Sequence, residues 1–134
     1  MIFVDTGAFL ARHLGRDQHH ASAVKAWRRL GKGTLLPATS NFVLDETFTL
    51  LGRWAGYAFA AERARALLGS DLLRILRPGE QEELDAIELF EKYVDQEVSF
   101  TDCISFALMR RHGIETAFTF DRHFSAAGFR VWPE

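Results

Sequence analysis

Several features that the sequence lacks exclude whole classes of protein. Cys103 is the only cysteine among 134 residues, so no disulfide can form within the chain and nothing indicates secretion. The first apolar residues end at Asp5 and follow no basic segment, unlike a signal peptide. No apolar run approaches the roughly 20 residues that span a bilayer. We therefore expect a cytoplasmic protein without a membrane segment.

A large charge imbalance is also missing. The chain has 16 basic and 18 acidic residues and a formal net charge of -2, whereas nucleic-acid-binding domains often carry a strong basic excess. Net charge is an average, however, and thirteen of the basic residues are arginines, whose guanidinium groups match phosphate oxygens. Composition alone therefore neither indicates nor excludes a nucleic-acid substrate.

Several well-known functional motifs are absent. The chain has no GxGxxG and no GxxxxGKS/T sequence, which argues against a bound dinucleotide or nucleotide, and no GxSxG elbow of a serine hydrolase. The five histidines include no HExxH pair, and His19 and His20 are adjacent and would diverge on a helix. His123 follows Asp121 closely enough to touch a substrate, but we assign it to the surface. The sequence therefore predicts no zinc site.

The residues that are present predict one α/β domain over residues 1–134. Apolar residues make up 48% of the chain, and apolar runs alternate with helical patterns, as in a parallel β-sheet flanked by helices on both faces. The expected strands are 2–4, 34–36 (closed by Pro37), 72–76, 117–120 and 129–132. The expected helices are 6–12, 17–31, 41–56, 58–68, 80–94 and 102–112, with Asp17, Thr39 or Ser40, and Thr101 as N-terminal caps and Gly113 as the last stop.

Acidic residues lie where such a sheet forms its active site. Asp5 ends the first expected strand, Asp121 ends the strand at 117–120, and Asp102 opens a helix on the same edge. In open α/β sheets, ligands bind beyond the carboxyl ends of the strands. Although a single aspartate at such a position is often only a cap or a turn former, three of them predict a shared site.

Glu46 is the fourth candidate, and helical spacing separates it from Asp45. Residues four apart lie on one face of a helix, so Glu46 shares its face with Phe42 and Leu50, which are apolar. A carboxylate on the buried side is costly unless it is paired or bound to a metal. A salt bridge to Arg53 or to another arginine would also satisfy Glu46, so its role stays open at this point. Four acids without a His or Cys cluster suit Mg²⁺ or Mn²⁺.

Four segments in this order resemble PIN domains, and the whole chain is most similar to the VapC-type toxins of prokaryotic toxin–antitoxin pairs. The segments are Phe3-Val4-Asp5-Thr6, Val43-Leu44-Asp45-Glu46-Thr47, Ser99-Phe100-Thr101-Asp102-Cys103-Ile104-Ser105 and Phe118-Thr119-Phe120-Asp121-Arg122-His123-Phe124. Each segment alone is a weak pattern. The ordered set of four is specific.

The resemblance implies an Mg²⁺- or Mn²⁺-dependent endoribonuclease that hydrolyses RNA phosphodiester bonds. Its catalytic and metal-binding acids would be Asp5, Glu46, Asp102 and Asp121, of which Asp5 and Asp102 would bind the metal most strongly. Thr6 and Thr101 match hydroxyl positions that support the acids. The resemblance also implies a homodimer and a cognate antitoxin protein as partner.

The substrate's backbone would be guided by arginines at the rim of the site. We expect Arg12, Arg16, Arg53 and Arg122 in this role, with Arg12 and Arg122 as the first candidates. The expected products are a 5′-phosphate and a 3′-hydroxyl.

Other functions remain open from the sequence. A phosphatase of the haloacid-dehalogenase type needs a second aspartate where Gly7 stands, and no lysine lies where a receiver domain needs one. The remaining alternatives are a PIN-fold module that binds metal without turnover and a DNA nuclease with the same acids. Small phosphate esters, DNA and RNA offered as substrates would separate these possibilities.

Overall fold

The strands form one parallel five-stranded sheet in the computed structural model, which describes all residues 1–134. The strands are β1 (Ile2–Val4), β2 (Pro37–Ser40), β3 (Arg74–Leu76), β4 (Thr116–Phe118) and β5 (Arg130–Trp132). Their order in the sheet is β3-β2-β1-β4-β5, so the direction of winding reverses between β1 and β4. At such a switch point the loops after the two strands diverge and leave a crevice for ligands.

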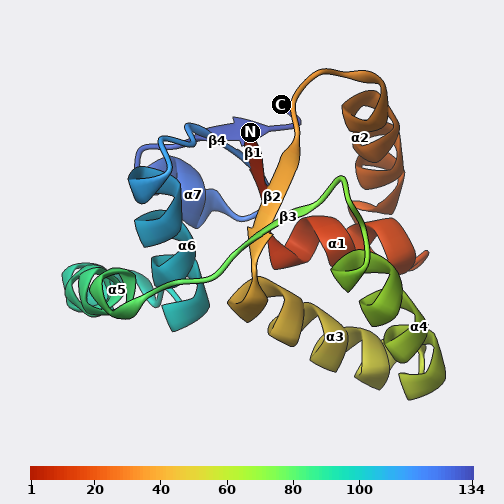
Figure 1. Cartoon of the computed structure of the whole chain (residues 1–134), viewed down its shortest axis with the longest axis horizontal. Coiled ribbons are helices and arrows are strands. Elements are labelled where there is room, and N and C mark those ends of the chain that lie inside the picture. Colours follow the sequence, from red (N-terminus) through yellow and green to blue (C-terminus); the bar gives the residue numbers. More distant parts are fainter.

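Helices cover both faces of the sheet, as predicted for this fold class. They are α1 (Thr6–His13), α2 (His20–Lys32), α3 (Asn41–Ala55), α4 (Tyr57–Leu68), α5 (Glu80–Lys92), α6 (Phe100–Arg111) and α7 (Arg122–Ala126), with a short 3-10 helix η1 (Val94–Gln96). In Figure 1, α1 and α2 lie to the right of the strands, and α5, α6 and α7 lie to the left. No helix is both long enough and apolar enough to cross a membrane.

The core is centred on β1, whose three residues are fully or almost fully buried. On one face, the ring of Trp27 from α2 packs against Phe118 of β4 with centroids 5.1 Å apart. On the other face, Phe106 of α6 meets Phe124 of α7 edge to face at 5.0 Å. Because the sheet is packed on both sides, only its edges are free to form a site.

The second strand differs from the prediction. We expected residues 34–36, but β2 begins at Pro37, and the side chains of Leu35 and Leu36 are about half exposed (51% and 50%). Proline is tolerated at the first residue of a strand. The buried residues of β2 include Thr39, whose hydroxyl donates to the carbonyl of Val4 at 2.8 Å. Because β2 contains a buried polar side chain whose hydrogen bond is satisfied, this strand does not form an apolar run in the sequence.

Of the three N-terminal caps predicted, one was correct. The hydroxyl of Ser40 accepts from the amide of Val43 at 3.1 Å and caps α3. Asp17 does not cap α2; it accepts from the amide of His19 in a turn, and the helix begins at His20. Thr101 does not cap α6 either, because the helix begins earlier and Ser99 is its cap, accepting from the amide of Asp102 at 3.0 Å.

The Ser99 cap has a measurable consequence. We expect Ser99→Ala to lower the free energy of unfolding by about 1 kcal/mol, because the amide of Asp102 loses its acceptor. Thr101 lies two residues after Ser99 and is not the cap. Thr101→Ala should therefore change the free energy of unfolding by less than about 0.5 kcal/mol. Urea denaturation of the two variants beside the wild type measures both. Equal losses in the two variants would contradict the assignment of the cap.

The segment after β4 also differs from the prediction. β4 ends at Phe118 rather than Phe120, and the unpredicted helix α7 follows. Asp121 caps this helix, since its carboxylate accepts from the amide of His123 at 2.8 Å. The chain therefore turns at the carboxyl edge of the sheet, next to the end of β1.

Candidate active site

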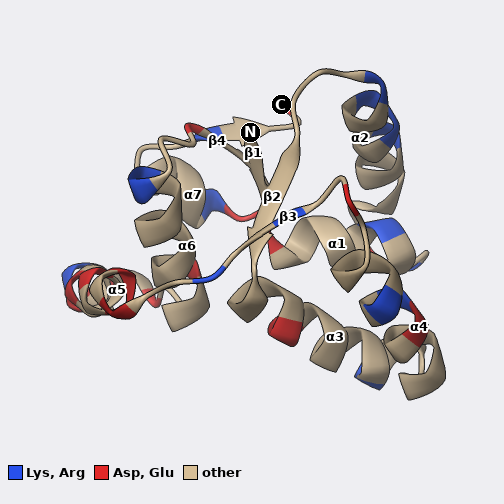
Figure 2. Cartoon of the chain, viewed as in Figure 1, with Lys and Arg blue, Asp and Glu red and all other residues tan.

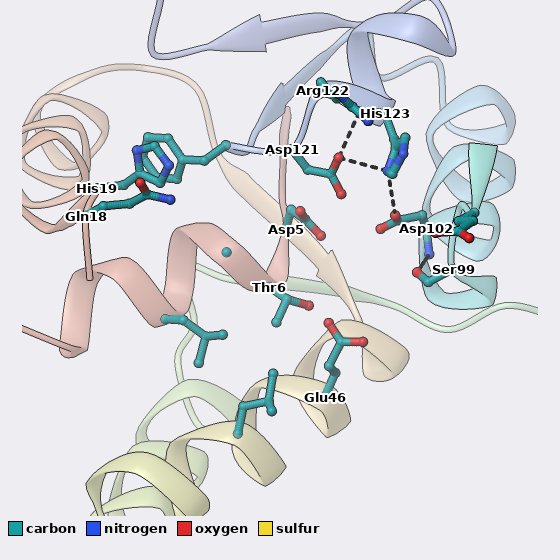
Figure 3. A pocket seen from close by; sticks show the side chains of 15 residues that line it. Asp5, Thr6, Gln18, His19, Glu46, Ser99, Asp102, Asp121, Arg122 and His123 are labelled. Carbon is teal, nitrogen blue, oxygen red and sulfur yellow. Dashed lines mark hydrogen bonds and ion pairs between the residues drawn. The ribbon is translucent and has the colours of Figure 1, made fainter. Parts of the chain in front are cut away.

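A cavity of ≈ 680 Å³ opens at the carboxyl edge of the sheet, beside the switch point between β1 and β4. The four predicted acids all line it: Asp5, Glu46, Asp102 and Asp121. Figure 3 shows them on separate parts of the chain, after β1, on α3, on α6 and after β4, with their side chains directed toward a common space. The fold thus brings together carboxylates that are up to 116 positions apart in the sequence (5 to 121).

Asp5 and Asp121 are held by one buried hydroxyl. Thr119 donates from Oγ1 to Oδ2 of Asp5 at 2.9 Å and accepts from the amide of Asp121, also at 2.9 Å. Thr119 is 1% exposed, so water does not compete for these bonds. This threonine, which we had placed inside a strand without a functional role, positions both aspartates.

Asp102 lies in the first turn of α6, where the helix dipole favours a negative charge. Its neighbour across the cavity is His123, whose Nδ1 is 3.9 Å from Oδ2 of Asp102 and 3.0 Å from Oδ1 of Asp121. Neither contact has the geometry of a hydrogen bond. The prediction that His123 is a surface residue is therefore wrong: its side chain is 20% exposed and lines the cavity.

Glu46 reaches the cavity from α3, as its helical position predicted. It is half-buried and lines the cavity together with Leu50, four residues on, whereas Asp45 is exposed and does not. No ion pair joins Glu46 to Arg53 or to any other arginine. The alternative explanation of Glu46 as a salt-bridge residue is therefore wrong, and its carboxylate is left facing the other acids.

Burial and mutual repulsion raise the pKa values of two of these acids. Burial raises the pKa of Asp5 to about 6, against the hydrogen bond from Thr119, which lowers it. Burial, together with the negative charges of Asp5, Asp121 and Glu46, raises the pKa of Asp102 to about 8. Ionising these carboxylates together is therefore costly. A cation in the cavity would neutralise their negative charge and reduce that cost.

Of the remaining predicted site residues, some line the cavity and others do not. Thr6 lines the cavity, but Thr101 does not; its carbonyl accepts from Ser105 within α6. Arg122 lines the cavity and is exposed. Arg12 does not line it, and its guanidinium lies 4.7 Å over the ring of Trp27. In Figure 2, Lys and Arg occur on several separate elements, and acidic segments lie at the end of β1 and on α3 and α6.

Sequence reasoning missed several residues of the cavity. Gln18, His19 and Phe120 line one part of it, and Glu97 adds a fifth carboxylate from a non-glycine residue with a left-handed backbone (φ 54°). Gln18, His19 and Glu97 belong to none of the four segments, and they reach the cavity from loops before α2 and before α6. Phe120 lies in the fourth segment, but it was expected as the last residue of a strand, and His19 was expected inside the helix 17–31. The one available signal was the place of Phe120 directly before Asp121.

Comparison with known proteins agrees with this geometry. The PIN domain profile matches residues 2–130. The chain is 41% identical, over the whole length of both proteins, to the 23S rRNA-specific endonuclease VapC20 of Mycobacterium tuberculosis. The crystal structure of VapC20, a Sarcin-Ricin loop cleaving toxin, matches with a TM-score of 0.87 at 38% identity over 96% of each chain.

More distant structures share the fold. A toxin–antitoxin complex from Klebsiella pneumoniae matches with a TM-score of 0.65 at 15% identity, over 94% of this chain and 91% of that one. VapBC-1 from nontypeable Haemophilus influenzae matches with a TM-score of 0.67 at 14% identity, over 98% and 96%. Sequence profile, full-length relative and fold all agree: the chain belongs to the PIN-domain family and is of the VapC type.

Proposed function

We propose that this chain is an endoribonuclease that uses Mg²⁺ or Mn²⁺ and acts as the toxin of a toxin–antitoxin pair. The observation that supports it most is the convergence of Asp5, Glu46, Asp102 and Asp121 on one cavity at the switch point of the sheet. The full-length relative VapC20 is a 23S rRNA-specific endonuclease, which makes 23S rRNA the first substrate to test.

The residues of the cavity fit a hard divalent cation. Ligand atoms of Asp102, Asp121 and His123 lie within 4.8 Å of one another, and Asp5 and Glu46 add carboxylate oxygens from the facing side. Oγ1 of Thr6 is buried at the same cavity without a hydrogen-bond partner, so a coordinated water would satisfy it. Oxygen-rich sites of this kind suit Mg²⁺ and Mn²⁺.

Each residue then has a role in hydrolysis. A bound Mg²⁺ or Mn²⁺ lowers the pKa of a coordinated water and neutralises charge on the phosphate. The carboxylates of Asp5 and Asp102 would hold the cation, with Asp121 and Glu46 completing the site, and Thr119 fixes the orientation of Asp5. Arg122 at the rim would contact a neighbouring phosphate. Cleavage of the bond between phosphorus and O3′ leaves a 5′-phosphate and a 3′-hydroxyl.

We also propose two protein partners. Leu84, Ile87 and Phe90 recur at helical spacing on α5 and are 45–51% exposed, which suits a homodimer contact. Trp54 and Tyr57, at the junction of α3 and α4, are 62% and 72% exposed and would be covered by the antitoxin. Light scattering of the free protein tests the first contact, since Ile87→Glu should convert a dimer to a monomer.

The function is tested by offering the purified protein three substrates in Mg²⁺, in Mn²⁺ and in EDTA. These are 23S rRNA, a DNA of the same sequence and p-nitrophenyl phosphate. We expect cleavage of the RNA alone, and only with metal. Cleavage of DNA would identify a DNA nuclease, hydrolysis of the ester a phosphatase, and metal binding without cleavage of any substrate a binding module; each would overturn the proposal.

Adjacent acids on α3 provide a matched test of the site. Glu46→Gln should slow RNA cleavage by at least ~10-fold, because the site loses a charge that helps hold the cation. Asp45→Asn removes the same charge one position away, on the exposed face of the helix, and should change the rate by less than about 2-fold. Initial rates at saturating Mn²⁺ measure both. An equal effect of the two substitutions would show that Glu46 acts only through net charge.

A further inference from the structure

An aromatic stack borders the acidic cavity without belonging to the acid cluster. The rings of His19 and Phe120 are parallel, with an interplanar angle of 1° and centroids 4.4 Å apart. Both residues line the cavity and both are partly exposed, and Gln18 lies beside them. In Figure 3, His19 and Gln18 lie on one side of the cavity and Asp102 on the other, with Asp121 and Asp5 between them.

The stack is anchored to the core through Phe120. The ring of Phe120 meets Phe118 edge to face at 6.2 Å, and Phe118 is completely buried. His19 is fixed from the other side, since its amide donates to the carboxylate of Asp17 at 2.8 Å. The backbone of His19 is therefore fixed at the turn, and its ring lies with one face against Phe120 at the border of the cavity.

The helix at this position does not explain the choice of histidine. His19 is the N-terminal cap of α2, where Ser, Thr, Asp and Asn stabilise a helix by accepting a backbone hydrogen bond. The side chain of His19 makes no such bond. Its ring is instead committed to the stack at the cavity, which indicates a role there rather than in the helix.

We propose that His19 and Phe120 form a stacking platform for one unpaired base of the RNA, next to the phosphate that is cut. This inference rests on the proposed ribonuclease function and adds the form of the substrate. Phe120 directly precedes Asp121, so the platform and a carboxylate of the acid cluster come from successive residues. A base stacked on His19 would place its own phosphate at the acids.

The platform selects a nucleotide by its accessibility more than by its identity. Stacking on an aromatic ring is open to every base, because every base has a flat face, but the base must be unpaired to expose it. The amide of Gln18 carries both donors and an acceptor and would contact the edge of the stacked base. The structure thus points to loops or single strands as substrates, not to regular duplex RNA.

Steady-state cleavage and base fluorescence test the platform together. The substrate is a short single-stranded RNA that carries 2-aminopurine, whose fluorescence is quenched on stacking, at each position next to the cut in turn. For His19→Ala we expect KM to rise roughly 5- to 100-fold with kcat nearly unchanged, and quenching to be lost at one position. His19→Phe should restore both values, since it keeps a flat ring. His112→Ala, an exposed histidine away from the cavity, should match the wild type.

The outcomes separate the platform from the proposed function. If the wild type cuts RNA while His19→Ala leaves KM and quenching unchanged, the platform is wrong and the ribonuclease stands. If His19→Phe behaves like His19→Ala, the ring does not act by stacking and the inference is also overturned. If no RNA is cut by the wild type, the ribonuclease proposal fails; quenching that depends on His19 would then support the platform, and absence of quenching would refute it.

Discussion

Asp102→Asn is expected to reduce RNA cleavage by at least ~10³-fold while the protein stays folded. The substitution keeps the size of the side chain but removes the charge that would hold the cation and, with it, several kcal/mol of transition-state stabilisation. Ser99 rather than the side chain of Asp102 caps α6, so the helix does not depend on the carboxylate. Cleavage rates at saturating Mn²⁺, with circular dichroism as the folding control, measure the effect.

A control separates this effect from a general loss of negative charge. Asp71→Asn, in the exposed turn before β3, removes the same charge far from the cavity and should leave cleavage within about 2-fold of the wild type. If Asp102→Asn retains more than about a tenth of the wild-type rate, Asp102 is not a principal ligand of a catalytic metal.

The second large effect concerns stability in the absence of metal. The pKa of Asp5 is raised to about 6 and that of Asp102 to about 8, from a usual value of 3.8, so the folded protein holds protons that the unfolded chain releases. A raised pKa gives stability that is fully present below about pH 4 and is lost as pH rises through the folded value. In EDTA, the free energy of unfolding should therefore fall between about pH 4 and 8, by about 3 kcal/mol from the shift of Asp5 alone and by more with that of Asp102.

Divalent metal should remove most of this loss, because a cation stabilises the ionised carboxylates. The rise in Tm on addition of Mg²⁺ or Mn²⁺ should accordingly be larger at pH 8 than at pH 5. Asp102→Asn should melt at a higher temperature than the wild type in EDTA at pH 8 and should respond less to metal. Thermal melts across this pH range measure both. A Tm in EDTA that is constant or rises from pH 5 to 8 would refute the raised pKa values.

The acid cluster could be predicted from the sequence because its signals are local. Asp5 and Asp121 follow apolar segments, and parallel strands present their carboxyl ends on one edge. The position of Glu46 relative to Asp45 followed from helical spacing, and the structure confirms the difference in exposure. These inferences needed only the fold class and the period of a helix.

Other features depend on contacts that no local pattern reveals. Thr119 positions Asp5 across 114 residues, and only the pairing of β1 with β4 brings the two together. The start of β2 was misplaced because its buried residues are Ala, Thr and Ser, whose polar groups are satisfied by neighbouring strands and helices. His123 was assigned to the surface because helix α7, which turns it toward Asp102, is only five residues long.

The most direct test of the account is the rate of 23S rRNA cleavage as a function of free Mn²⁺, measured for the wild type and for Asp102→Asn. We expect the wild-type rate to be negligible in EDTA and to rise to saturation with Mn²⁺, and the variant to stay near zero throughout. Cleavage that persists in EDTA, or that is equal in the two proteins, would contradict a metal-dependent ribonuclease site at these four acids.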